Sequence, residues 1–432
     1  MKSNWKRNLA LFLTGQGITL FGSMLVHYAV MWHITLKTQS GVMMTFIAIA
    51  GTLPMFFIAP FAGVWADRYN KKHIINIADA AIAFVTLIMA GAFSLGVDSA
   101  WLLLLCLIMR ALGLGVQMPA VNALVPDLVP QEHLTRVNGI SGSIQSIVMF
   151  ASPMAGGALI AVLPIQALLF IDVITAAVGI SILQFFVATP EHPRKSEHNA
   201  DGGRLSGAKR YFAEISEGLQ YVSQHSFLKR LLVIASLYNI MIAPASILSQ
   251  LQVVRGWGDQ VWNVLGFSFG PEQRLAALNV VYFTGMTLGG FVMGAWGGFK
   301  NKSRSMALSM TAQGAFAAGM GVMGLFGEFG LYLGCVLTTG FFVPVFTAPL
   351  IAILQSKIDP GFMGRVFSVL SMMSSLMMPL GMVLWGPLGD IVAIDWLLIG
   401  TGTFIFLMGF MFVLNKTLLI AGVPSTLEKE PL

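Results

Sequence analysis

Long apolar runs separated by short polar segments make up most of this chain of 432 residues. A run of about 18 or more apolar residues is long enough to cross a bilayer as a helix. Twelve such runs can be placed, and they predict an all-α polytopic membrane protein. The expected helices cover residues 8–36, 42–66, 73–95, 100–124, 138–161 and 165–188, followed by 227–254, 276–298, 303–325, 329–353, 364–386 and 393–416.

The composition agrees with a lipid environment. Hydrophobic residues make up 56% of the chain and charged residues only 10%, whereas a soluble domain carries about 25% charged residues. A net charge of +6 would suggest nucleic-acid binding in a soluble protein. Here the basic residues lie mostly in short loops beside the apolar runs, so we expect a lipid bilayer as partner and no nucleic acid.

The distribution of lysine and arginine orients the predicted helices. Most of the 25 basic residues fall in segments on the side of the N terminus, and only Lys37, Arg255 and Arg274 fall in loops on the opposite side. Short loops rich in lysine and arginine remain in the cytoplasm. The prediction is a multi-pass protein of the cytoplasmic (inner) membrane with both termini in the cytoplasm.

A sequence repeat divides the chain into two halves of six helices. GVWADRYNKK at 63–72 and GAWGGFKNKS at 294–303 share Gly, Trp, Asn and Lys, and each closes the second helix of its half. Duplicated bundles are a transporter architecture with the substrate path between the halves. We expect an N-terminal bundle over 1–188, a cytoplasmic linker over 189–226 with an amphipathic helix on the membrane surface, and a C-terminal bundle with a short cytoplasmic tail over 227–432.

Several segments resemble one transporter family. Residues 63–72 match the G-x-x-x-D-R-x-x-[KR]-[KR] loop signature of the major facilitator superfamily, in the place where that family has it. Arg110, Gly113 and Gly115 resemble the fourth-helix motif of its proton antiporters. SPMAGG at 152–157 loosely resembles the fifth-helix antiporter motif, although Ser152 replaces the usual first glycine.

Two further segments, VPDLVPQEHL at 125–134 and MGRVFSVLSMMSSLMMPLG at 363–381, are similar to the macrolide-efflux and multidrug branch of the superfamily. The resemblance implies two six-helix bundles, antiport of a drug against protons and a monomeric transporter. It also implies that the proton gradient drives transport without a cofactor.

The resemblance gives the loop signature a gating role. Asp67 would face the positive N-terminal end of the eleventh helix, and Lys71 and Arg68 would bridge it to Asp127, so that the cytoplasmic side is held closed. A solvated charge cluster that follows the distribution of basic residues is the alternative. The predicted gating residues are Gly63, Asp67, Arg68, Lys71, Lys72 and Asp127.

Ionisable residues inside the apolar runs are candidates for proton coupling, because a charge at membrane depth is costly and is usually functional or paired. Arg110 lies near the middle of its helix, and we expect a carboxylate or polar partner on a neighbouring helix. A structural role is the alternative for every member of this group. The proton-coupling candidates are Asp79, Arg110, Asp172 and His27.

Polar side chains at helical spacing predict a watery cavity. Gln16, Thr19, Ser23 and His27 share one face of the first helix, and a polar stripe on an apolar helix is expected to face water inside the bundle. The fourth and seventh helices carry similar stripes, and Pro244 predicts a kink in the seventh. The candidates for contact with substrate are Gln16, Thr19, Ser23, Gln117, Asn239, Ser246 and Gln250.

These features predict proton-coupled efflux of amphipathic organic compounds, of the macrolide or multidrug type, by alternating access, with drug resistance as the consequence. Export or facilitated passage of a siderophore, lipid or other metabolite is one alternative, and lipid scrambling is another. The sequence shows no Walker A loop or HExxH motif, so we expect no enzyme activity and no metal. The aromatic residues of the outer loop 255–275 predict an interfacial belt or a lid.

Overall fold

The computed structural model describes residues 5–160, 162–188, 207–258, 262–264, 267–359 and 362–423. The chain forms two compact units. Unit 1 contains Met1–Ile34 and Phe46–Phe212, and unit 2 contains Thr35–Thr45 and Ala213–Leu432. The short segment that joins the first two helices therefore packs with the second unit, although the rest of both helices belongs to the first.

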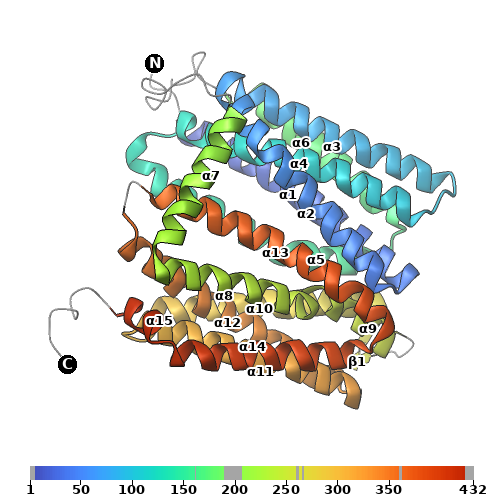
Figure 1. The fold of residues 1–432 in the computed structure, drawn as a ribbon. Helices are drawn as coiled ribbons and strands as arrows, with labels where there is room; N and C mark the ends of the chain where they lie inside the picture. The colour runs from blue at the N-terminus through green and yellow to red at the C-terminus, as the bar shows by residue number, and fades with distance from the viewer. Residues whose placement is uncertain are drawn as a thin grey trace. The chain divides into compact units, whose positions relative to one another are not determined.

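Unit 1 is built from six long helices, and α3 packs between α4 and α6 (Figure 1). The helices span the ranges that the apolar runs predict, with ends that differ by a few residues. They are α1 (Trp5–Thr38), α2 (Gly41–Arg68), α3 (Lys71–Ser94), α4 (Ala100–Leu128), α5 (Leu134–Ile160) and α6 (Ile165–Ser181), which a π-helical turn (Ile182–Phe186) extends. A 3-10 turn (Gln131–His133) precedes α5.

Unit 2 begins its bundle with one interrupted span, in which a π-helical turn (Pro244–Leu248) separates α8 (Ser226–Ala243) from α9 (Ser249–Trp257). The irregularity predicted at Pro244 takes this form, because proline cannot donate the regular helical hydrogen bond. A hairpin of β1 (Trp262–Val264) and β2 (Phe267–Phe269) follows. The remaining helices are α10 (Pro271–Trp296), α11 (Lys302–Phe326), α12 (Phe329–Lys357), α13 (Met363–Ile391), α14 (Ile394–Leu414) and α15 (Lys416–Ala421).

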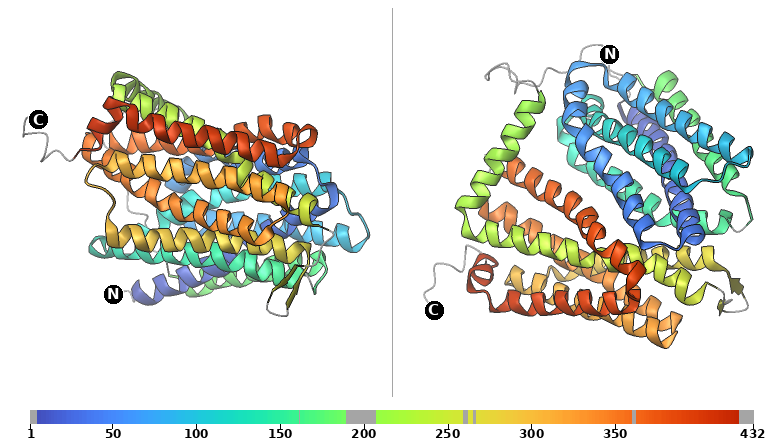
Figure 2. Two further views of the ribbon diagram at one scale, coloured as in Figure 1. Left: turned by 90° about the horizontal axis from the view of Figure 1, so that it is seen from below. Right: turned by 45° about the vertical axis from the view of Figure 1, so that its right-hand side comes forward.

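Within the described residues, eleven helices are long and apolar enough to cross a membrane. Of the twelve predicted spans, only α11 does not reach this level of hydropathy, since glycine, serine and glutamine interrupt its apolar residues. It is nevertheless a helix of 25 residues, and it runs beside α12 and α14, both of which qualify (Figure 2). The architecture is therefore an all-α polytopic membrane fold in which α11 is the least apolar of the predicted spans.

Close helix packing in unit 2 depends on small residues. An added Cβ at Gly289 of α10 would collide with the carbonyl oxygen of Phe341 on α12, and one at Gly340 would collide with the carbonyl oxygen of Tyr282. In lipid, helices associate largely through such tight van der Waals contact, because lipid tails are as apolar as the side chains.

The amphipathic segment of the linker forms α7 (Gly207–Gln224), and part of its apolar side packs within unit 2. Ile215 and Tyr221 are buried, and the Tyr221 ring stacks on Phe362 with 4.6 Å between ring centroids. Glu217 forms an ion pair of 3.1 Å with Arg365 in the first turn of α13. The linker residues 189–206 lie outside the described residues.

The loop predicted over residues 255–275 is also shorter than the sequence indicates, because α9 and α10 extend into that range. Trp257 ends α9 as a buried residue whose Nε1 donates to the carbonyl oxygen of Gly327 at 2.9 Å, so its assignment to an interfacial belt or lid is wrong. Arg274 belongs to the first turn of α10 and is buried over the ring of Phe329. Both residues pack inside unit 2 because the helices extend beyond the predicted loop limits.

Candidate functional site

A cavity of about 670 Å³ lies within unit 1, among α1, α2, α4 and α5. Its polar lining consists of amide, hydroxyl and imidazole groups, and His27 is the one titratable side chain that the described residues contribute to it. The rest of the wall is apolar and includes several methionines. The polar lining residues are Gln16, His27, Gln117, Asn122, Asn138, Ser141 and Gln145.

The polar stripe on α1 divides between two environments. Gln16 and His27 line the cavity, whereas Thr19 and Ser23 do not. The Thr19 hydroxyl donates to the Gly15 carbonyl oxygen at 3.1 Å and lies against Gly179 of α6. The prediction that Thr19 and Ser23 face the cavity is therefore not met, because the stripe is broad enough for part of it to pack against the neighbouring helices.

Asp79 and Gln117 connect the cavity wall to a buried carboxylate. The side-chain amide of Gln117 on α4 donates to Asp79 Oδ1 on α3 at 2.5 Å, and it lies 3.5 Å from Gln16 Oε1. Asp79 is only 1% exposed, and its Oδ2 has no hydrogen-bond partner among the described residues. The carboxylate therefore lies one hydrogen bond behind the cavity, with one oxygen unsatisfied.

Arg110 and Asp172 form a buried ion pair of 2.5 Å between α4 and α6. Side chains from two further helices complete it. The Ser23 hydroxyl donates to Asp172 Oδ1 at 3.2 Å, and the Thr86 hydroxyl, which also contacts Arg110, lies 3.1 Å from Asp172 Oδ2. The carboxylate partner expected for Arg110 is thus Asp172. The attraction and the hydrogen bonds together offset the loss of hydration that isolated buried charges would suffer.

Thr86 is a member of this cluster that the sequence analysis does not predict. A threonine in an apolar run carries little signal, because its hydroxyl is readily satisfied by the helix backbone, as happens here with the Ile82 carbonyl oxygen. The useful signal is its spacing of seven residues from Asp79, which places both on one face of α3.

The loop signature at the end of α2 supplies contacts within unit 1. Lys71 forms an ion pair of 2.5 Å with Asp127 near the end of α4. The ammonium of Lys72 donates to the carbonyl oxygens of Gln184 and Val187 at 2.9 Å each, where the helix dipole favours a cation. Gly63 lies in α2 with open space beside it.

The side chains of Asp67 and Arg68 lie outside the described part of the chain. The contact between Asp67 and the eleventh helix therefore stays a prediction, as does the gating role of the signature.

The candidates of unit 2 lie near the break in its first span. Gln250 is buried in α9, and its Oε1 has no partner among the described residues. Ser246 belongs to the π-helical turn, and Asn239 donates to the Ala235 carbonyl oxygen at 2.8 Å within α8. The Tyr238 hydroxyl, beside Asn239, donates to Gln313 of α11. These polar side chains are all uncharged, and the buried charge described above for this unit, Arg274, lies in the first turn of α10.

Several relatives of this chain are named as efflux proteins. Macrolide efflux protein A of Streptococcus pyogenes is 28% identical over 407 residues, which cover 93% of this chain and 94% of the relative. Macrolide efflux protein A of Enterococcus faecalis is 29% identical over 340 residues, covering 78% and 98%. The multidrug efflux pump Tap of Mycobacterium bovis is 26% identical over 198 residues, covering 44% and 45%.

Solved structures share the fold at low sequence identity. A POT family transporter in complex with 5-aminolevulinic acid has a TM-score of 0.72 at 12% identity, covering 94% of this chain and 96% of the transporter. The nucleoside transporter NupG has a TM-score of 0.67 at 14% identity, covering 95% and 98%. The family model of the Major Facilitator Superfamily matches residues 8–382. With that match and these relatives, the chain belongs to the major facilitator superfamily of membrane transporters.

Proposed function

We propose that this transporter exports amphipathic organic compounds of the macrolide or multidrug type from the cytoplasm, in exchange for protons, by alternating access. The proposal includes location in the cytoplasmic membrane with both termini inside the cell. The names of the relatives supply the direction of transport and the substrate class. The coupling to protons is argued below from the residues of unit 1.

The observation that carries the proposal is the cavity of unit 1 with Asp79 directly behind its wall. An apolar surface with scattered amide and hydroxyl groups suits large, mostly apolar ligands that carry carbonyl, hydroxyl or amine groups. Methionine side chains such as Met24 and Met55 adapt their shape to different ligands. The cavity therefore fits a range of amphipathic molecules better than a single small polar metabolite.

Among the candidates, Asp79 is the side chain that fits proton exchange best. Asp172 is neutralised by Arg110 and held by hydroxyl donors, so a proton on it would disrupt an ion pair. Asp79 has a single described donor, Gln117, which also faces the cavity. A substrate that draws the Gln117 amide toward itself would remove that donor, and the carboxylate would then favour the protonated form.

In this scheme Gln117 links substrate binding to the protonation of Asp79. His27 lines the same cavity and is the second group that could exchange protons with its water. Arg110 pairs with Asp172 and also contacts Ser23 and Thr86, so it joins α1, α3, α4 and α6, and its part in coupling is to set the electrostatic field around Asp79.

The test is accumulation of a radiolabelled macrolide in a pump-deficient bacterial host. Cells that produce the protein should hold several-fold less macrolide than cells with an empty vector, and an uncoupler should abolish the difference. If the difference persisted without a proton gradient, coupling would be excluded while export remained.

The alternatives separate in reconstituted vesicles. Equal macrolide accumulation in producing and empty cells, combined with flipping of labelled lipid by vesicles without a gradient, would replace the proposal with a scramblase. Gradient-dependent transport of a siderophore or other metabolite, with no effect on macrolides, would retain the mechanism and change the substrate.

A further inference from the structure

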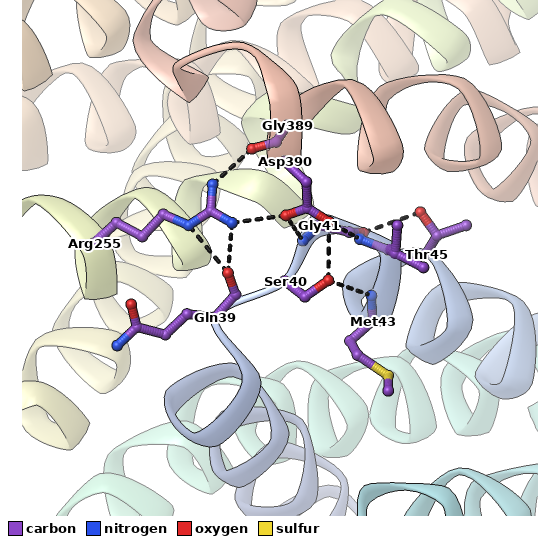
Figure 3. Close-up of polar contacts among 9 residues, drawn as sticks. Gln39, Ser40, Gly41, Met43, Thr45, Arg255, Gly389 and Asp390 are labelled. Carbon is purple, nitrogen blue, oxygen red and sulfur yellow. Dashed lines mark hydrogen bonds and ion pairs between the residues drawn. The ribbon is translucent and has the colours of Figure 1, made fainter.

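Asp390, in the last turn of α13, is bonded to the beginning of α2 (Figure 3). Its Oδ1 accepts from the backbone N–H of Gly41 at 2.6 Å, and its Oδ2 accepts from the backbone N–H of Val42 at 3.0 Å. The Ser40 hydroxyl donates to Oδ2 at 2.9 Å. The carboxylate thus caps the positive end of α2, whose first N–H groups have no partner within the helix.

Arg255, at the end of α9, holds the same junction from the other side. Its Nη2 donates to Asp390 Oδ1 at 2.7 Å, and its Nη1 donates to the Gly389 carbonyl oxygen at 2.6 Å. Its Nε donates to the carbonyl oxygen of Gln39 at 3.1 Å. Gln39 has a φ of 45°, in the left-handed region that non-glycine residues rarely adopt, so the guanidinium helps to hold a sparsely populated backbone conformation.

The two helices approach closely enough that side chains are excluded between them. An added Cβ at Gly41 would collide with the carbonyl oxygen of Gly386, and one at Gly386 would collide with the Thr45 hydroxyl. That hydroxyl donates to the Met382 carbonyl oxygen of α13 at 2.7 Å. The junction therefore combines the carboxylate cap from Asp390, the guanidinium hydrogen bonds of Arg255 and the close helix contact at Gly41 and Gly386.

All these residues belong to unit 2, although α2 beyond Thr45 belongs to unit 1. The first turn of α2 is thus fastened to α13 inside unit 2. Two-state switching in packed proteins commonly depends on contacts of this kind, which exist fully in one state and are absent in the other.

We propose that Asp390 and Arg255 form a latch that holds the outer end of α2 against α13, and that the latch must open for the cavity to reach the outside. The assignment to the outer side rests on the proposed orientation and on alternating access. The other charged side chain of α13 with a described ion pair, Arg365, lies at the opposite end of the helix and pairs with Glu217. The latch thus has no second ion pair on its own helix that would replace it.

Release of the latch has a measurable consequence that requires no transport substrate. In a background of Cys106→Ser and Cys335→Ser, a Met24→Cys substitution places a single thiol on the cavity wall. A membrane-impermeant maleimide added to whole cells labels this thiol only when the outer side is open. Added to inverted membrane vesicles, the same maleimide reports opening toward the cytoplasm.

Asp390→Asn should raise the rate of labelling in whole cells by about tenfold or more, since it weakens several charge-assisted hydrogen bonds at once. Labelling in inverted vesicles should fall, because a larger population of the outward-open state means a smaller population of the inward-open state. Arg255→Lys should have an intermediate effect, since an ammonium cannot reproduce the fork to Asp390, Gly389 and Gln39.

The double variant Asp390→Arg and Arg255→Asp exchanges the two charges, and it distinguishes the contribution of the helix cap from that of the ion pair. The pair can form again, but an arginine cannot accept from the N–H groups of α2, so labelling from outside should stay high. Return of the parental labelling rate in this variant would overturn the role of the cap.

Glu217→Gln is the matched control, because it removes an ion pair at the other end of α13 and should leave labelling from outside unchanged. An Asp390→Asn protein that labels from outside at the parental rate or more slowly would overturn the latch. A rise on both sides would indicate unfolding and would equally overturn it. Altered labelling without macrolide export would keep the latch and reject the proposed substrate, so the two proposals fail separately.

Discussion

The two units place their charged residues differently within a shared fold. In unit 1, Asp79, Arg110 and Asp172 lie inside helices, at most 3% exposed, and each bonds to another helix. In unit 2, the charged residues of the described spans from α8 to α14 lie in the first or last two turns of their helices. Farther from the helix ends, the contact between Tyr238 and Gln313 is neutral, and the buried Arg274 lies in the first turn of α10.

This difference separates two physical tasks. The charge of a buried carboxylate is costly unless a neighbouring group stabilises it. A change in that neighbour can therefore drive uptake or release of a proton, which makes such a carboxylate suitable for coupling. A charged group at a helix end can exchange protein partners for water when the helix moves, which makes it suitable for switching. The interior of the first unit therefore holds the candidates for coupling, and helix ends hold the candidates for gating, with Asp390 and Arg255 in unit 2 beside the loop signature of unit 1.

Asp79→Asn should have the largest effect on function, because it removes the carboxylate proposed to exchange the proton. We expect macrolide accumulation in cells that produce this variant to match that of uncoupler-treated parental cells, while the amount of folded protein stays normal. Thr287→Ala, which changes an exposed hydroxyl bonded to the Phe283 carbonyl oxygen of its own helix in unit 2, is the control and should retain gradient-driven efflux. Full efflux by the Asp79→Asn protein would remove coupling from this site.

Arg110→Ala should have the largest effect on stability, since it leaves the buried Asp172 without its partner. Loss of one member of a buried ion pair costs about 3–5 kcal/mol, and the measurement is thermal unfolding of the purified protein in detergent. Arg365→Ala, at a helix end of unit 2 and partly exposed, should cost less than about 1 kcal/mol. Similar losses for both variants would contradict the distinction between interior and terminal charges.

Gly289→Ala tests whether neutral packing holds unit 2 together. The added methyl group would collide with the α12 backbone at Phe341, and overpacking of this kind costs about 1–3 kcal/mol. Its neighbour Gly290 has open space beside it, so Gly290→Ala should leave the melting temperature unchanged or slightly raised. Equal melting temperatures for the two variants would show that the contact between α10 and α12 is looser than described.

Glu217→Gln should have the smallest effect. Its ion pair with Arg365 is partly exposed, so water screens it, and the loss should stay below about 0.5 kcal/mol. The apolar side of α7 should hold the helix in place without it, which limited proteolysis between α7 and α8 can check. Faster cleavage in the variant would show that the ion pair, rather than burial of Tyr221, anchors the linker helix.

Much of the architecture can be predicted from the sequence. Each span corresponds to one continuous apolar run, and the bilayer requires such a run to be helical because the helix satisfies its own backbone hydrogen bonds. The helices α1 to α6 and α8 to α14 therefore lie where the apolar runs place them. The sequence also predicts that Arg110 has a partner, because cationic side chains buried in the membrane are usually paired.

The partners themselves are decided only by the tertiary structure. Helical spacing places Ser23 on the polar face of α1, but that face is broad enough to border both the cavity and α6. Whether Ser23 faces the cavity or Asp172 therefore depends on how α1 is rotated against α4 and α6. In the sequence, Asp390 is an acidic residue at the end of a predicted helix with no sign of a partner. Its role as a cap for α2 follows only from the packing of segment 35–45 against α13. Local hydropathy determines which residues enter the membrane, whereas contacts between residues hundreds of positions apart determine what the buried polar groups do.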